Sequence, residues 1–206
     1  MILSNELQLK YSQIRDKIKS RLEDFRSIPR EKYFYELCYC LCTPQSKAQS
    51  AQIVQNELEK MDFLNQDFDP VGILRNKNNY IRFHNQKSIR LIEIKNNFDE
   101  ILKCLDSTIS ANEKRDWLFN NIKGLGMKES SHFLRNIGYR NLAILDRHIL
   151  KHLNLAGVYD EIPKIKSQRH YLEIEERFRE FSQKIDIPID QLDLLFWSNE
   201  TGEILK

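Results

Sequence analysis

The sequence predicts an all-α protein, and three observations support that fold class. The chain of 206 residues is 41% hydrophobic and 30% charged, close to the globular average, so it can bury a core. Its six glycines and five prolines are about 5% of the residues where roughly 12% is usual, which leaves few turns for a many-stranded sheet. Apolar residues recur at helical spacing, and no strand pattern of comparable length appears.

The first third of the chain contains three predicted helices. From Asn5 to Ile28, apolar residues recur at steps of three or four, which places them on one face of a helix. A more apolar helix runs from Tyr33 to Cys42 and ends before Pro44, because the residue preceding a proline avoids helical geometry. Ser46 can cap a third helix that reaches about Met61.

The remainder is also predicted to be helical, except for residues 64–79, which are rich in Asn and Asp and predict a loop with one short helical turn. Near the end, Ser167 can cap a helix reaching Ile185, and Pro188 suits the first turn of the last helix. The other helices are expected at 88–98, 101–105, 112–122 and 129–138, the last of them stopped by Gly138.

The net charge of +2 is too balanced to indicate a nucleic-acid partner, so any basic surface must be local. No run approaches 18 apolar residues, and the N-terminus lacks a basic segment followed by an apolar one. We therefore expect a soluble, unexported, cytoplasmic protein that makes no membrane contact.

The four cysteines do not form a pattern typical of a metal site. Cys38, Cys40 and Cys42 crowd one helix at a spacing that cannot direct all three at one ion, and Cys104 is remote from them in the sequence. They are expected to be small buried residues in a reducing compartment.

Two glycines one residue apart, Gly124 and Gly126, predict a tight hairpin between helices, which Ile122 and Leu125 would anchor. Backbone N–H groups at the start of the following helix would then be exposed to an anion such as phosphate. On spacing alone, a plain helix–helix turn that requires glycine for packing explains the pattern equally well.

The residues after the hairpin favour a phosphate-binding hairpin over a plain helix–helix turn. Asp146 follows an apolar run and precedes a new helical period, so it fits a helix N-cap with its carboxylate at the positive end of the helix. Between Lys123 and Lys151 there are six basic residues and two acidic ones, a local net charge of +4.

The ordered pair of motifs resembles the helix–hairpin–helix DNA glycosylase superfamily. Its bifunctional members have a lysine after the second hairpin glycine, as in G-L-G-M-K with Lys128, and an aspartate 18 residues later, as in L-D-R-H with Asp146. Within that superfamily, the string from Ile122 to Tyr139 and the terminus T-G-E-I-L-K resemble the archaeal 8-oxoguanine DNA glycosylase/lyases of the second type. The endonuclease III branch is disfavoured, because no cysteine follows Cys104.

The resemblance implies two helical lobes with a DNA-facing cleft and the helix–hairpin–helix motif, at about 112–138, beside it. One lobe would comprise residues 1–31 and 141–206, and the other residues 32–140. Lys128 and Asp146 would meet at the junction.

The implied reaction excises 8-oxoguanine from duplex DNA and cleaves the abasic strand by β-elimination. Lys128, as a free amine, would attack the sugar C1′ and form a Schiff base, while the Asp146 carboxylate stabilises positive charge on the sugar. An exposed lysine is protonated at pH 7, so burial and cationic neighbours must favour the free amine. On the alternative interpretation, Lys128 is an ordinary surface lysine and Asp146 only caps its helix.

Four residues are implied in recognition of the lesion base. In the family the last residue, here Lys206, enters the lesion pocket, where its oxygens would accept a hydrogen bond from the N7 proton that 8-oxoguanine has and guanine lacks. Phe83 and Trp197 would stack on the extruded base, although both also fit a core role. Asp193 would either bond the Watson–Crick edge or simply be solvated.

The hairpin residues Gly124, Gly126 and Lys123 would bind DNA phosphate. No cofactor is expected, apart from a monovalent cation that hairpin carbonyls hold in the superfamily. His132 and His148 adjoin the motif, and packing or phosphate contact is favoured over proton shuttling.

The expected partner is double-stranded DNA containing 8-oxoguanine, bound by a monomer. The rival functions are a glycosylase for another oxidised base and a non-catalytic DNA-binding module.

Overall fold

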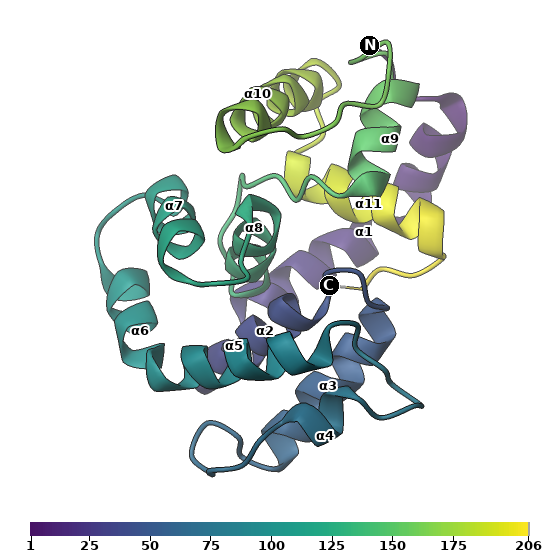
Figure 1. Ribbon diagram of the computed structural model, residues 1–206. Helices are drawn as coiled ribbons and strands as arrows, with labels where there is room; N and C mark the ends of the chain where they lie inside the picture. The colour runs from purple at the N-terminus through teal and green to yellow at the C-terminus, as the bar shows by residue number, and fades with distance from the viewer. Residues whose placement is uncertain (206) are drawn as a thin grey trace. The chain divides into compact units, whose positions relative to one another are not determined.

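A computed structural model of the protein describes residues 1–205, and all the regular structure in that range is helical (Figure 1). The predicted all-α class is therefore confirmed. The helices are α1 (Asn5–Arg26), the short 3-10 helix η1 (Arg30–Lys32), α2 (Tyr33–Cys42), α3 (Ala48–Lys60), α4 (Val71–Leu74), α5 (His84–Asn96), α6 (Phe98–Asp106), α7 (Ala111–Asn121), α8 (Met127–Asn136), α9 (Arg147–Leu155), α10 (Gln168–Lys184) and α11 (Ile189–Thr201).

Most predicted helices are confirmed within a few residues, and two details were wrong. The α3 helix begins at Ala48 without a side-chain cap, because the Ser46 hydroxyl accepts a hydrogen bond from the Arg82 N–H instead. The α5 helix begins four residues before the predicted Ser88, directly after Phe83, whose left-handed backbone ends the preceding turn. In contrast, Ser167 caps α10 as predicted.

The chain forms two compact units. Unit 1 contains Met1–Ser27 and the chain from Leu134 onward, and unit 2 contains Ile28–Phe133. The second crossing between them falls inside α8. The lobes expected from the resemblance had boundaries after residues 31 and 140.

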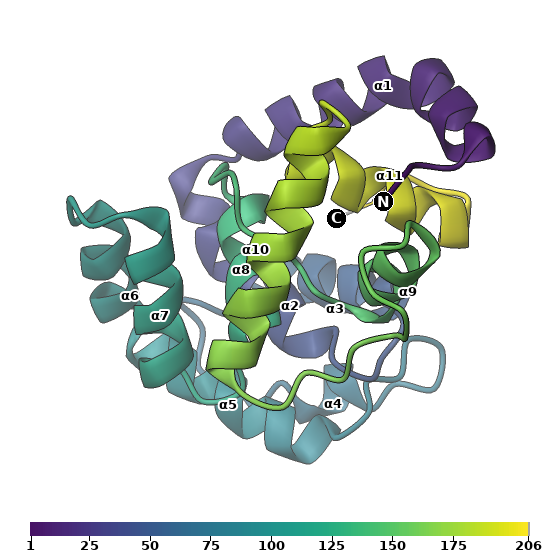
Figure 2. The ribbon, with the colours of Figure 1, turned by 90° about the horizontal axis from the view of Figure 1, so that it is seen from above.

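The core of unit 2 is built around α2, which contacts α3 and α5. Nine of its ten residues are buried, which explains why the sequence of this helix is apolar all round. Phe34 packs edge-on against Tyr35 and Phe98, with ring centroids 5.2 Å apart in each pair. The four cysteines are free and buried, as predicted, and burial raises the pKa of Cys42 to about 12, so its thiol is inert at neutral pH. Helices α6 and α7 lie side by side at the edge of this unit (Figure 2).

In unit 1, α11 contacts α1, α9 and α10. Its Leu192, Leu195 and Phe196 are fully buried, and the Phe196 ring stacks on His152 of α9 with centroids 4.6 Å apart. Gly138, with φ +99°, ends the turn after α8 where a Cβ would lie only 3.0 Å from the Arg26 Cα, so glycine is required there. Of the helices in residues 1–205, none is both long and apolar enough to cross a membrane.

Candidate active site

The hairpin between α7 and α8 has the predicted form. Ile122 leaves α7 in an extended conformation, and both Ile122 and Leu125 are buried as anchors. Gly124 has φ +96°, so its conformation requires glycine. A Cβ there would lie 2.6 Å from the Cδ of Arg90, a flexible side chain that can move aside. The Ile122 carbonyl accepts the Leu125 N–H at 3.2 Å and keeps a second lone pair. Such an oxygen fits the expected monovalent cation, which stays a prediction.

Glu129 is the residue at the hairpin that the sequence analysis missed. Its Oε2 accepts the Gly126 N–H at 3.2 Å, so one of the amides expected to be open to phosphate is occupied by a carboxylate. Glu129 stands three positions after Gly126, the spacing at which an acidic side chain reaches back to the start of its own helix. That spacing is the signal that would have identified it.

Lys128 lies in the first turn of α8, immediately after the hairpin. Its side chain is 28% exposed, and its Nζ is 3.0 Å from the Glu129 Oε1. The two oxygens of Glu129 therefore engage the predicted nucleophile and the hairpin backbone together. Lys123, the predicted phosphate ligand, is 80% exposed and pairs with Glu93 at 3.3 Å.

Asp146 is the N-cap of α9, as predicted. Its Oδ1 accepts the N–H groups of His148 at 2.8 Å and Ile149 at 2.9 Å. Because one oxygen makes both capping bonds, the other is not needed to hold the helix. Lys128 belongs to unit 2 and Asp146 to unit 1, and the predicted meeting of their side chains stays a prediction.

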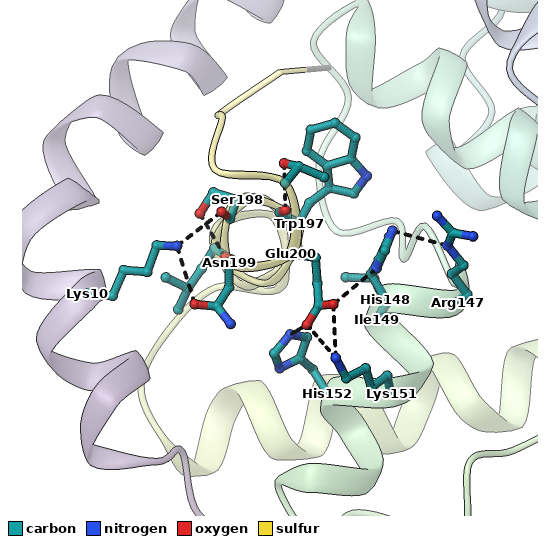
Figure 3. Close-up of polar contacts among 12 residues, drawn as sticks. Lys10, Arg147, His148, Ile149, Lys151, His152, Trp197, Ser198, Asn199 and Glu200 are labelled. Carbon is teal, nitrogen blue, oxygen red and sulfur yellow. Dashed lines mark hydrogen bonds and ion pairs between the residues drawn. The ribbon is translucent and has the colours of Figure 1, made fainter. Parts of the chain in front are cut away.

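A cluster of charged side chains follows Asp146 in unit 1 (Figure 3). The Glu200 carboxylate of α11 accepts from Lys151 at 2.9 Å and lies 3.0 Å from the His152 Nε2, both on α9. His148 lies further away, with its Nδ1 3.7 Å from Glu200. Glu200 thus ties the helix that Asp146 caps to the helix that carries Trp197.

Two of the residues expected to recognise the lesion base are accessible. Phe83 is 52% exposed and carries the Arg82 guanidinium 5.5 Å from its ring centroid, so the alternative of a core role is wrong for this residue. Trp197 is half-buried on α11. Contact of either ring with a base stays a prediction.

Of the other two residues expected to recognise the lesion base, the structure describes Asp193. Asp193 is buried and pairs with Arg135 at 3.5 Å, so the alternative of a solvated carboxylate is wrong. The Arg135 guanidinium also lies 4.6 Å from the Phe25 ring centroid. Lys206 lies outside the described residues.

The remaining titratable residues do not form a metal site within residues 1–205, where no group of three His, Cys, Asp or Glu side chains is arranged to hold an ion. His132 is buried, and its ring meets Tyr39 edge-on at 5.6 Å. This packed position agrees with the interpretation favoured for His132.

An all-helical fold with a glycine hairpin, a lysine opening the next helix and an aspartate capping a later one defines the class of helix–hairpin–helix DNA glycosylases. The family model described as 8-oxoguanine DNA glycosylase, Ogg-HhH, matches residues 18–187. The chain belongs to this family.

Relatives are similar over the full length. The 8-oxoguanine DNA glycosylase/AP lyase of Fusobacterium nucleatum is 39% identical over 98% of this chain and 97% of that protein. The protein of the same name from Methanocaldococcus jannaschii is 37% identical over 100% of both chains. The crystal structure of the M. jannaschii enzyme with a 15mer DNA containing 8-oxoguanine superposes with a TM-score of 0.85, at 36% identity over 97% of this chain and 96% of that one.

Proposed function

We propose that this protein excises 8-oxoguanine from double-stranded DNA and then cleaves the abasic strand. The observation that carries the proposal is the position of Lys128, directly behind the hairpin in a chain whose full-length relatives are named 8-oxoguanine DNA glycosylase/AP lyase. A non-catalytic DNA-binding module would need the hairpin but no partly buried lysine beside it.

In the proposed mechanism the Lys128 amine forms a bond to C1′ of the sugar as the N-glycosidic bond breaks. The base departs with the bonding electrons and takes up a proton, and the Asp146 carboxylate stabilises the positive charge that develops on the sugar. Opening of the sugar ring gives a Schiff base, and removal of a C2′ proton then expels the 3′ phosphate. The amine must lose a proton and leave its ion pair with Glu129 before it can attack.

The lesion is proposed to be distinguished from guanine at N7, where the oxidised base carries a proton. An acceptor oxygen of Lys206 would gain a hydrogen bond from 8-oxoguanine and meet a lone pair on guanine. The exposed ring of Phe83 and the half-buried ring of Trp197 are proposed to replace the stacking that the base loses on extrusion. One copy of the chain is proposed to act on the duplex.

Borohydride trapping tests the proposal, because reduction fixes the Schiff base as a covalent protein–DNA adduct. We expect an adduct on duplex DNA containing 8-oxoguanine and its loss, with excision reduced at least about 10³-fold, in Lys128→Gln. Lys103→Gln is the matched control: it removes a 71% exposed lysine of α6, in the same unit, that pairs with Glu100 and has no proposed role in DNA binding, and it should retain the adduct.

Two results would contradict the proposal. Wild-type protein that binds the duplex but gives neither released base nor adduct would be a binding module. Equal or faster release of thymine glycol would indicate a glycosylase for another oxidised base with the same lysine.

A further inference from the structure

Unit 2 holds three residues other than glycine in the left-handed region, namely Gln45, Asp62 and Phe83, and two of them lie in turns connected through one buried lysine. Gln45, after Pro44, has φ 57°, and Phe83, which precedes α5, has φ 59°. Both side chains are exposed, so burial of the side chain does not compensate the strain. Such a conformation costs on the order of 1–3 kcal/mol and persists only where the surroundings fix it.

One buried side chain bonds to the first turn and is connected through Ser46 to the second. Lys87, in the first turn of α5, is 2% exposed, and its Nζ donates to the carbonyl oxygens of Cys42 and Pro44, each at 2.7 Å. The same ammonium lies 3.4 Å from the Ser46 Oγ. Gln45 is therefore flanked on both sides by groups that Lys87 holds.

The Ser46 hydroxyl connects the second turn to the first. Its Oγ accepts the Arg82 N–H at 3.0 Å, and Arg82 immediately precedes Phe83. A chain of bonds thus runs from the Lys87 ammonium through the Ser46 hydroxyl to the backbone N–H of Arg82, one residue before Phe83. The Phe83 carbonyl accepts the backbone N–H of Lys87 at 2.9 Å, which is a bond of α5 and does not depend on the Lys87 side chain.

Within residues 1–205, the bonds of the Lys87 ammonium go to neutral oxygen atoms. Burial is the main reason that its pKa is lowered to about 8. The charged and titratable groups around it include Cys42 on α2, Arg90 on α5, and Lys128 and Glu129 on α8, of which Glu129 favours the charged form. Because burial makes an ammonium costly, the bonds that it makes to the turn, and not a gain in stability, distinguish this lysine.

We propose that Lys87 is a positioning residue for capture of the lesion base, which sets the backbone of the turns that present Gln45 and Phe83 to DNA. The inference rests on the proposed function and adds a residue to it. The electrostatic effect of Lys128 on Lys87 places this ammonium in the neighbourhood of the proposed nucleophile, within unit 2.

The test compares Lys87→Met with Lys114→Met. Lys114 is also a buried lysine of unit 2, 6% exposed, and donates to the Leu105 carbonyl at 2.6 Å, so it measures the general effect of losing such a bond. We expect Lys87→Met to lower single-turnover excision of 8-oxoguanine roughly 10- to 100-fold, because misplacement of contact groups by about 1 Å has effects of that size. Because both variants leave a buried carbonyl oxygen without its donor, the two rates are compared at equal folded fraction. Lys114→Met should excise at the wild-type rate.

A fluorescent base placed next to the lesion supplies a readout of extrusion. Its fluorescence increase on binding should be reduced by Lys87→Met and unchanged by Lys114→Met. If Lys87 acts through the Phe83 turn, the double variant Lys87→Met/Phe83→Ala should excise within about twofold of Phe83→Ala alone, because the two losses are shared.

The outcomes separate the two hypotheses. Wild-type protein that releases no 8-oxoguanine would overturn the proposed function. Active wild-type protein combined with a folded Lys87→Met variant of equal activity would overturn the positioning role alone. A loss of activity that only follows the unfolded fraction, or fully additive losses in the double variant, would also overturn it.

Discussion

The starts of α8 and α9 differ in how they hold the two proposed catalytic side chains. At α9 the catalytic candidate is itself the cap, and the Asp146 Oδ1 is fixed by two backbone N–H groups. At α8 the capping bond comes from Glu129, while Lys128 makes an ion pair with that same carboxylate. The comparison indicates a stationary carboxylate and an amine that can reorient on a flexible stem.

Among the changes that test this comparison beyond Lys128→Gln, the largest effect is expected from removing the negative charge of Asp146. Asn and Asp are equally good N-caps, so Asp146→Asn should keep the stability of α9 while excision falls about 10²- to 10³-fold through loss of charge stabilisation. Asp146→Ala should lose about 1 kcal/mol of unfolding free energy in addition. Single-turnover excision and urea unfolding of both variants measure the two effects. Wild-type excision by Asp146→Asn would show that Asp146 is only a cap.

Substitution of a second carboxylate, Asp193, tests whether this buried side chain is only structural or also recognises the lesion base. Removing it leaves the buried Arg135 without its ion pair, and Asp193→Ala should therefore lose about 3 kcal/mol in urea unfolding. The ratio of 8-oxoguanine to guanine excision should be compared at equal folded fraction. A changed ratio would support contact with the base, and an unchanged ratio would leave Asp193 a structural residue.

The start of α8, where the Lys128 side chain can reorient, is tested by Glu129→Gln. The amide oxygen can still accept the Gly126 N–H, but the ion pair with Lys128 is lost. We expect adduct formation at pH 7 to become about two- to fourfold faster, because the proposed nucleophile no longer has to leave an ion pair before it attacks. Tighter DNA binding should accompany it, since one carboxylate is removed from the hairpin. Slower adduct formation with unchanged binding would show that Glu129 assists the attack.

The smallest effect is expected in the pH dependence of unit 1. Burial lowers the pKa of His152, so folding favours the neutral imidazole and stability is lost as pH falls below the ordinary histidine value. The bond from Lys151 lowers the pKa of Glu200, whose contribution is present above the ordinary glutamate value and is lost as pH falls through the folded one. Both effects reduce the thermal midpoint in acid. Glu200→Gln should flatten the decrease below about pH 5, and an identical profile would exclude the carboxylate as its source.

Periodicity and caps were sufficient to predict most helices, because these signals are local. The Asp146 cap, the Ser167 cap and the buried hairpin residues Ile122 and Leu125 all followed from neighbouring residues. Ser46 could not be predicted correctly, since its hydroxyl is engaged by Arg82 from a distant turn.

Site residues were predictable from the sequence where they belong to a local motif. They were not predictable where their environment depends on contacts between segments that are distant in the sequence. The burial of Asp193 depends on Arg135, 58 residues away in the sequence. Lys87 carried no signal, because its carbonyl partners lie on a turn more than 40 residues earlier. Glu129 could have been found from its spacing to Gly126 alone.

The pairing of Lys128 with its own neighbour bears on how DNA would enter the proposed site. Both oxygens of Glu129 are engaged, one by the Gly126 N–H and one by Lys128, so a phosphate that approaches the hairpin meets a carboxylate in its place. If Lys128 is the nucleophile, displacement of that single side chain by a duplex would open the backbone amide and release the amine in one event.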